Sequence, residues 1–271
     1  MAEGTRLTDL ESKGSAMSED TAGAVVENSV GSARVALVTG ASRGVGASVA
    51  RMLAEAGVDV VVNYRDKARR AANVLAEVEG AGARGLAVQA DMTDRESVRS
   101  MLATIGEAFG RLDLLILNAS GGLEKDVAGD YALRLNRDAQ RDLVDAALPS
   151  MRAGGRIVFV TSHLAHFHGE KPVMPEYEIV ASSKKAGEDA LRAMVPRMTA
   201  AGVSLVVVSG DLIDGSITPR LLDRMRPGVI ERRRDKTGWL PTTEDFARAI
   251  VDAAVDEDQA TGVTVFVGST D

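Results

Sequence analysis

Hydrophobic and polar residues follow two alternating periods along the chain, from residue 34 to the C-terminus. Short aliphatic and β-branched runs such as Val35-Ala36-Leu37-Val38-Thr39 are typical of buried parallel strands. Between these runs, apolar residues recur at helical spacing, as Val49, Met52 and Leu53 do. The predicted strands span 35–39, 58–63, 85–90, 112–117, 156–161, 203–208 and 263–267. The predicted helices span 46–56, 67–78, 95–109, 131–151, 180–200 and 243–255.

This regular alternation of strands and helices predicts the fold class. Parallel strands that are joined by helices form right-handed crossovers, with helices on both faces of the sheet. We therefore expect a single α/β domain over residues 33–271, with a Rossmann-type, doubly wound parallel sheet in three layers, α/β/α. Residues 1–32 are rich in Gly, Ser, Ala and acidic residues and have no sustained period, so we expect a disordered N-terminal tail there.

One stretch, residues 211–239, interrupts the alternation and contains the basic segment 231–236. In open α/β sheets, ligands bind beyond the carboxyl ends of the strands, where such an insertion lies. The stretch is therefore a candidate substrate lid. A solvated surface loop explains the same pattern equally well.

The composition narrows the class of protein. The 271 residues carry a formal charge of −7 and only 3% aromatic residues, which argues against a nucleic-acid partner. No apolar run approaches the roughly 18 residues of a membrane-spanning helix, and the sequence begins without the pattern of a secretion signal. The absence of cysteine excludes disulfides and thiolate metal sites, and it fits a cytoplasmic protein.

The first strand runs into a glycine-rich turn, Gly40-Ala41-Ser42-Arg43-Gly44-Val45-Gly46, and a helix follows. Glycines at these positions allow a tight turn and the close approach of a pyrophosphate, while the helix directs its N–H groups at the anion. Three glycines alone are weak evidence, but the strand before them and the helix after them make the pattern specific. The sequence therefore predicts a dinucleotide site at this turn.

The end of the second strand distinguishes between the two nicotinamide cofactors. NAD-binding proteins usually place an acid about 20 residues beyond the glycines, where it holds the ribose 2′-hydroxyl. Here the strand ends in Asn63, Tyr64 and Arg65, and Asp66 comes only after the basic residue. Arg43 in the turn adds a second guanidinium, and two guanidiniums suit a 2′-phosphate. We therefore predict NADP(H), with Asn63 and Arg65 among its contacts.

These motifs resemble the short-chain dehydrogenase/reductase family, in its compact single-domain branch. The resemblance begins at about residue 34 and runs to the C-terminus, and the segment from Thr39 to Gly46 matches the family's TGxxxGxG turn. It implies that Asp91 and Met92 contact the adenine. It also implies that Asn118-Ala119-Ser120-Gly121, after the fourth strand, supports the central sheet beside the cofactor.

The same resemblance implies a set of active-site residues. Ser162, at the end of the fifth strand, matches the serine that polarises a substrate carbonyl. Asn136 resembles the helix asparagine that helps to hold a proton-relay water. Lys184, within Ala181-Ser182-Ser183-Lys184-Lys185-Ala186, resembles the lysine that holds the nicotinamide ribose.

The sequence departs from the family at the tyrosine that normally precedes this lysine by four residues. Counting back four residues from Lys184 or Lys185 reaches Val180 or Ala181, neither of which can donate a proton. Tyr177 lies seven residues before Lys184, about two helical turns, so it shares the lysine's face if the helix begins early. A proline just upstream leaves open that Tyr177 lies in an approach loop instead.

Three proton donors are therefore open: Tyr177, a histidine, or an acidic hydroxyl on the substrate itself. All three histidines, His163, His166 and His168, follow Ser162 at the carboxyl end of a strand. Their spacing also admits a metal site, but no partner ligand is evident, and we expect no metal. A histidine-bearing loop that shapes the substrate pocket is the simpler interpretation.

Two functions follow from the sequence. The first is an NADPH-dependent reductase of a small-molecule carbonyl, such as a secondary metabolite or an acyl-type substrate, with an atypical proton donor. The second is a non-catalytic NADP(H)-binding protein that senses redox state or holds a partner. The family resemblance also implies a homodimer or a homotetramer.

Overall fold

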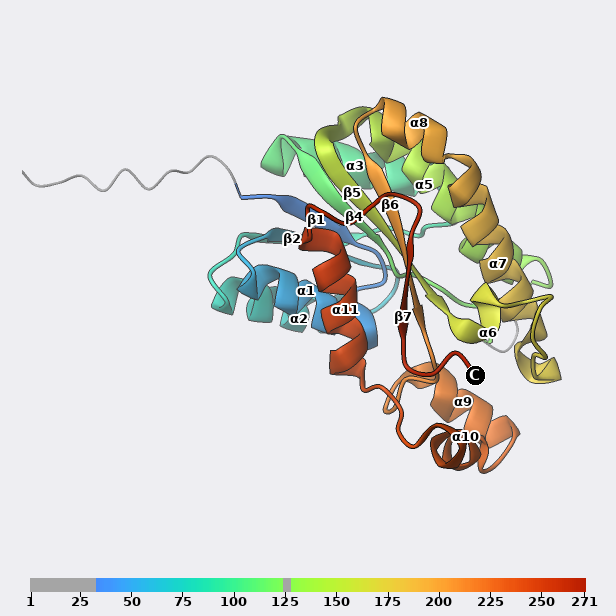
Figure 1. Cartoon of the computed structure of the whole chain (residues 1–271). Helices are drawn as coiled ribbons and strands as arrows, with labels where there is room; N and C mark the ends of the chain where they lie inside the picture. Colours follow the sequence, from blue (N-terminus) through green and yellow to red (C-terminus); the bar gives the residue numbers. More distant parts are fainter. Residues whose placement is uncertain (1–32, 124–127) are drawn as a thin grey trace, which may run out of the picture. The chain divides into compact units, whose positions relative to one another are not determined.

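Seven parallel strands form one sheet in the order β3-β2-β1-β4-β5-β6-β7 (Figure 1). The computed structural model describes residues 33–123 and 128–271, so the predicted tail over 1–32 lies outside the described residues. The strands are β1 Val35–Val38, β2 Asp59–Tyr64, β3 Gly85–Gln89, β4 Leu112–Leu117, β5 Met151–Ser162, β6 Ser204–Gly210 and β7 Thr264–Val267. Strands β1 to β3 are added in one direction along the sheet, and β4 to β7 are added in the other, starting next to β1. Where the strand order reverses in this way, the carboxyl ends of the strands form a crevice in which ligands bind.

Helices cover both faces of the sheet, which confirms the predicted three-layer fold (Figure 1). Helices α1, α2 and α11 pack on one face, and α3, α5, α7 and α8 pack on the other. The helices are α1 Gly44–Glu55, α2 Ala68–Gly80, α3 Arg95–Phe109, α4 Tyr131–Leu133, α5 Ala139–Ala147, α6 His163–His166, α7 Glu178–Ala193, α8 Val195–Ala200, α9 Ile217–Met225, α10 Val229–Thr237 and α11 Thr243–Val255. None of the helices within the described ranges is long and apolar enough to cross a membrane.

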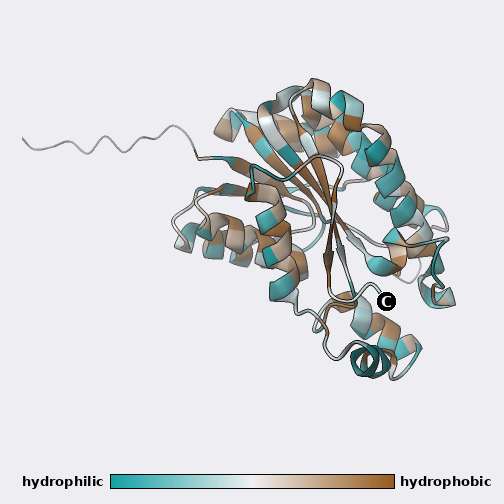
Figure 2. Ribbon diagram, in the orientation of Figure 1, coloured by the Kyte–Doolittle hydropathy of each residue, from teal (hydrophilic) through white to brown (hydrophobic). Residues whose placement is uncertain are grey.

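The core lies on both sides of the sheet, as β1 illustrates. Ala36 and Val38 belong to the hydrophobic cluster under α1 and α11, whereas Val35 and Leu37 belong to the cluster under α3 and α5. Because successive strand residues point to opposite faces, covering both faces demands the continuous aliphatic runs seen in the sequence. Burying one such aliphatic side chain completely stabilises the fold by roughly 1.5–3 kcal/mol relative to leaving it exposed. Figure 2 shows this hydrophobic layer along the strands.

The long helical region predicted over 131–151 is interrupted in the structure. It begins as α4, passes through a π-helical turn at Arg134–Asp138, continues as α5 and ends in a 3-10 turn at Leu148–Ser150. Met151 already belongs to β5, so the predicted end was one residue late. The π-helical turn contains Asn136, and such turns occur often at functional sites.

The helix predicted over 180–200 begins earlier and divides in two. A 3-10 turn at Pro175–Tyr177 leads directly into α7 at Glu178, so the helical backbone continues from Tyr177 toward Lys184. Helix α8 follows after Met194, with a proline in its first turn, where the missing N–H breaks no helical bond.

The segment 211–239 is helical rather than an irregular loop, because α9 and α10 occupy most of it. Arg233 of α10 pairs with Asp211 at the end of β6, with an Nε–Oδ1 distance of 2.9 Å. The same guanidinium donates to the backbone carbonyls of Ser269 and Asp271 at 2.7 and 2.6 Å. These bonds fasten the predicted lid to the carboxyl ends of β6 and β7.

Candidate functional site

The turn after β1 has the backbone geometry that its glycines predict. Gly40 and Gly44 have φ angles of +64° and +57°, in the left-handed region that favours glycine. Gly46 is needed for space instead. A Cβ atom at Gly46 would lie 2.5 Å from Nδ2 of Asn118 and 2.8 Å from the carbonyl oxygen of Gly40. The turn therefore requires glycine twice for conformation and once for close contact.

The backbone N–H groups of residues 42–46 stand at the amino end of α1. Within the described residues, none of these groups has a hydrogen-bond acceptor. Free N–H groups and the helix dipole place partial positive charge here, and the exposed side chain of Arg43 adds a full charge. This cradle of unpaired amides fits the pyrophosphate of a dinucleotide.

Two asparagines predicted to contact the cofactor lie under this turn. Asn63 is 2% exposed; its Oδ1 accepts from the Gly40 amide at 3.1 Å, and its Nδ2 donates to the Ala90 carbonyl at 3.2 Å. Asn118 donates from Nδ2 to the Thr39 carbonyl at 2.9 Å. Because these side chains bond to backbone atoms, the structure gives them the role of holding the turn in shape.

Asp91 and Met92 lie at the same edge of the sheet, just after β3. One carboxylate oxygen of Asp91 accepts from both the backbone N–H and the hydroxyl of Thr93, each at 2.8 Å. Met92 is 7% exposed and packs in the core under α3. The pair therefore shapes the start of α3, and its contact with an adenine stays a prediction.

Arg65 follows directly after β2 and is held by two neighbours. Its Nε donates to Oδ2 of Asp66 at 2.8 Å, and its Nη1 donates to the hydroxyl of Tyr131. The bond to Asp66 raises the pKa of Arg65, so the guanidinium stays charged. The sequence did not single out Tyr131, because it stands 66 residues away and belongs to no motif.

Ser162 and Tyr177 meet at the carboxyl end of β5. Their hydroxyl oxygens are 3.2 Å apart, although the sequence left open whether Tyr177 lies on the helix or in a loop. Tyr177 is 3% exposed, and burial raises the pKa of its phenol, an effect that the bond to Ser162 partly opposes. Helix α7 begins one residue later, so the backbone that carries Lys184 fixes this tyrosine.

Val180 occupies the position at which the resemblance leads one to expect a tyrosine. It is 3% exposed and packs in a hydrophobic cluster with Tyr177, Ala181 and Leu222. On its other side, a Cβ atom added at Gly122 would lie 3.1 Å from Cγ2 of Val180. The site therefore presents an apolar side chain at this turn of the helix, and the phenol reaches Ser162 from the turn before it.

Lys184 lies on α7 with 8% of its surface exposed. Within the described residues it makes no hydrogen bond and no ion pair. Burial without a partner lowers the pKa of Lys184 to about 8. A buried ammonium with no partner lowers the free energy of unfolding. Such unfavourable burial of a charged group is typical of residues that bind a ligand.

We expect Lys184→Met to stabilise the protein near neutral pH. The pKa of Lys184 is about 8 in the folded protein, whereas a lysine in the unfolded chain has its usual value of 10.5. Below pH 8 the lysine is therefore charged in both states, and the folded protein bears the full cost of the buried charge. The cost vanishes above 10.5, where the lysine is neutral in both states. The free energy of unfolding should therefore rise by roughly 3 kcal/mol at pH 7, and by less at pH 9.5. Urea denaturation at the two pH values measures this.

Lys185→Met is the matched control, because Lys185 already pairs with Asp189 at 2.7 Å. It should change the free energy of unfolding by less than about 1 kcal/mol at either pH. Equal effects of the two substitutions would contradict a charged, buried Lys184.

Asn136 ties three elements together in the interior. Its Nδ2 donates to the Gly121 carbonyl and to the Ser183 hydroxyl, both at 2.9 Å, and its Oδ1 accepts from the Gly121 amide at 3.2 Å. The side chain thus joins the π-helical turn to the segment after β4 and to α7. It anchors the residue next to Lys184, and its contact with a relay water stays a prediction.

The three histidines after Ser162 have three different partners. His163 Nδ1 lies 2.8 Å from the Ser209 hydroxyl, His166 Nδ1 lies 2.9 Å from Glu188, and His168 Nε2 lies 2.7 Å from Glu178. Burial lowers the pKa of His163 to about 4, so this ring is neutral and a poor acid at pH 7. No cluster of three metal-binding side chains occurs in the described part of the chain. Each of the three histidines is therefore already engaged with another side chain.

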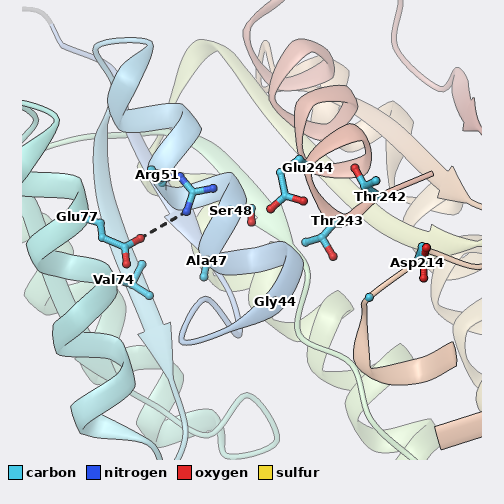
Figure 3. A pocket seen from close by; sticks show the side chains of 11 residues that line it. Gly44, Ala47, Ser48, Arg51, Val74, Glu77, Asp214, Thr242, Thr243 and Glu244 are labelled. Atoms are coloured by element: carbon cyan, nitrogen blue, oxygen red, sulfur yellow. Dashed lines mark ion pairs between the residues drawn. The ribbon is translucent and has the colours of Figure 1, made fainter. Parts of the chain in front are cut away.

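A separate hollow of about 570 Å³ lies between α1, α2 and the start of α11 (Figure 3). It shares Gly44 with the dinucleotide turn, but Ser162, Tyr177 and Lys184 do not line it. Arg51 pairs with Glu77 across it at 3.5 Å, and the carboxylates of Asp214 and Glu244 also line it. Three carboxylates and one guanidinium disfavour a phosphate, so we assign the dinucleotide to the amide cradle and not to this hollow.

The fold and site together define a nicotinamide-dependent oxidoreductase: a dinucleotide cradle and a serine–tyrosine pair lie at the carboxyl edge of one doubly wound sheet. A family model described as short chain dehydrogenase matches residues 34–224. The protein belongs to the short-chain dehydrogenase/reductase family.

Relatives of known name support this assignment. The chain is 33% identical to 1-cyclohexenylcarbonyl-CoA reductase of Streptomyces collinus over 228 residues, which is 76% of this chain and 80% of that protein. It is 36% identical to versicolorin reductase 1 of Aspergillus parasiticus over 167 residues, 59% of this chain and 62% of that protein. A short-chain dehydrogenase from Burkholderia cenocepacia in complex with NADP superposes with a TM-score of 0.74 at 29% identity, over 87% of this chain and 96% of that one.

Proposed function

We propose that this protein is an NADPH-dependent reductase of a small-molecule ketone, in which Tyr177 donates the proton. The observation that carries the proposal is the 3.2 Å distance between the hydroxyls of Ser162 and Tyr177. A serine and a tyrosine at this distance can both bond to one carbonyl oxygen. Tyr177 is therefore close enough to Ser162 to act as the proton donor, although it does not stand four residues before Lys184.

The residues divide the chemistry in a simple way. A reduced nicotinamide, when bound, supplies the hydride that forms the new C–H bond. The Ser162 hydroxyl donates a hydrogen bond to the carbonyl oxygen and stabilises the charge that develops there. Tyr177 then protonates that oxygen, so the ketone becomes an alcohol and the phenol becomes a phenolate. The ammonium of Lys184 would hold the nicotinamide ribose, as the family resemblance implies.

Charge at the adenosine end supports NADP(H) over NAD(H). Arg65 stands where NAD-binding proteins place an acid, and Arg43 adds a second positive charge from the turn. Guanidinium groups bind phosphates through paired hydrogen bonds. The related Burkholderia cenocepacia structure contains NADP, which agrees with this preference.

The substrate class follows from the lid and from the relatives. Leu222 of α9 belongs to the same hydrophobic cluster as Tyr177, which supports the proposal that the segment 211–239 is a substrate lid. The relatives named above are, by their names, reductases of 1-cyclohexenylcarbonyl-CoA and of versicolorin. We propose a carbonyl on an acyl-type or secondary-metabolite substrate, and a homodimer or homotetramer as the active form.

A screen of NADPH oxidation against a panel of ketones, quinones and β-ketothioesters tests the proposal. We expect turnover with at least one ketone. Tight NADPH binding without turnover of any carbonyl would instead support the second candidate, a non-catalytic NADP(H)-binding protein. One observation favours that candidate: within the described residues, the Lys184 ammonium makes no bond with Tyr177, whose pKa burial raises.

A further inference from the structure

A contact between Arg65 and Tyr131 bridges two segments that lie on either side of the dinucleotide turn. In the sheet, β1 lies between β2 and β4. Arg65 follows β2, whereas Tyr131 opens α4, which follows β4 in the described part of the chain. The hydrogen bond from Arg65 Nη1 to the Tyr131 hydroxyl therefore passes the carboxyl end of β1, where the glycine turn begins.

The two partners differ in rigidity. Tyr131 is 8% exposed and belongs to the hydrophobic cluster under α3 and α5, so its ring is fixed by the core. The Arg65 side chain is 47% exposed and extends from the end of a strand. Its guanidinium carbon lies 6.0 Å from the centre of the Tyr131 ring, within the range of a cation–π contact. The buried Tyr131 therefore holds the more exposed Arg65 side chain in position.

Asp66 is the second partner of Arg65, and it is itself exposed. It binds Nε of Arg65 at 2.8 Å, and an arginine held by this carboxylate alone would follow the exposed Asp66 side chain. With Tyr131 holding Nη1, the guanidinium is fixed at two of its nitrogen atoms. Within the described residues, its third nitrogen, Nη2, has no partner. The arginine thus keeps donors free for a ligand while its orientation is set by the protein.

Arg43, the other guanidinium near the turn, has no such support. It is exposed, and within the described residues it makes no side-chain bond. An unsupported arginine loses rotamer freedom when it binds a ligand, whereas a side chain that is already oriented loses less. Of these two guanidiniums, Arg65 is therefore the one that the protein already orients.

We propose that Tyr131 is a positioning residue for cofactor selectivity: its hydroxyl holds Arg65 in the orientation that receives the 2′-phosphate of NADP(H). The inference rests on the proposed NADP(H) preference. It adds a residue that lies outside the glycine turn and outside the end of β2, and that makes no contact with the phosphate itself. Its effect should therefore appear with NADPH and be absent with NADH, which has no 2′-phosphate.

The test is a fluorescence titration of NADPH and NADH with the wild type and with Tyr131→Phe, which keeps the buried ring and removes only the hydroxyl. We expect the Kd for NADPH to rise about three- to tenfold and the Kd for NADH to stay unchanged. Tyr64→Phe is the matched control: Tyr64 precedes Arg65, and within the described residues its hydroxyl makes no bond. It should leave both Kd values unchanged.

The same substitution in an Arg65→Met background separates positioning from a general structural role. If Tyr131 acts through Arg65, Tyr131→Phe should have no further effect on NADPH once the guanidinium is absent. A wild type that prefers NADPH, combined with an unchanged ratio of Kd values in Tyr131→Phe, would overturn the inference and leave the NADP(H) preference intact. An effect that persists in the Arg65→Met background would also overturn it. A wild type that binds both cofactors equally would overturn the NADP(H) preference itself and the inference with it.

Discussion

Replacement of Tyr177 by phenylalanine should lower kcat for carbonyl reduction by about 10²–10⁴-fold, the usual contribution of a general acid. The phenol lies 3.2 Å from the Ser162 hydroxyl, and the aromatic ring that would remain keeps its place in the hydrophobic cluster with Leu222. The Kd for NADPH should therefore stay within about twofold of the wild-type value, and the fold should be retained. Single-turnover oxidation of NADPH, followed with the best ketone of the screen, measures the effect.

The histidines provide the control for this prediction. His168→Gln removes a titratable group that pairs with Glu178 at the surface, and it should leave kcat within about twofold. If Tyr177→Phe retained wild-type turnover and a histidine variant lost most of it, the proton donor would be a histidine of the segment after Ser162 and not Tyr177.

Replacement of Gly46 by valine should weaken cofactor binding strongly. The added Cβ atom would lie 2.5 Å from Asn118 Nδ2 and 2.8 Å from the Gly40 carbonyl oxygen, and the second of these atoms is backbone. The turn must therefore shift, which distorts the cradle of N–H groups. We expect the Kd for NADPH to rise on the order of 100-fold or more, equivalent to ~2.7 kcal/mol. Overpacking should also lower the free energy of unfolding by about 1–3 kcal/mol.

Gly106→Ala is the matched control for Gly46→Val. Gly106 lies inside α3, and a Cβ atom there would meet no atom within 4 Å. Because alanine favours the helix, the control should gain about 0.5–1 kcal/mol in stability and bind NADPH as the wild type does. Normal NADPH binding by Gly46→Val would contradict the assignment of the pyrophosphate to this turn.

Most of the fold was predictable because local patterns and the final packing agree. The strand over 112–117 and the helices over 95–109 and 243–255 match their predicted bounds, since each has one clear period and a definite end. The predictions were wrong where the local pattern does not show an interruption. The π-helical turn within 131–151 and the break at Met194 lie inside continuous helical patterns, and tertiary packing decides them.

The candidate site was only partly predictable, for a different reason. Sequence motifs predicted Ser162 and the glycine turn because each follows a strand, and they predicted Lys184 from its Ala-Ser-Ser-Lys context. They left the proton donor open, because whether Tyr177 faces Ser162 depends on where α7 begins. They missed Tyr131 altogether, since nothing in its local sequence indicates a partner at the end of β2. Contacts between distant segments become visible only once the sheet order is known.

Transfer of deuterium from NADPH that carries deuterium at both C4 positions of the nicotinamide tests the central claim most directly. The wild-type protein should yield an alcohol that carries one deuterium at the former carbonyl carbon, detected by mass spectrometry. Tyr177→Phe should yield little or none under the same conditions while still binding the labelled cofactor. A wild-type protein that binds NADPH tightly and transfers no deuterium to any carbonyl would contradict the account.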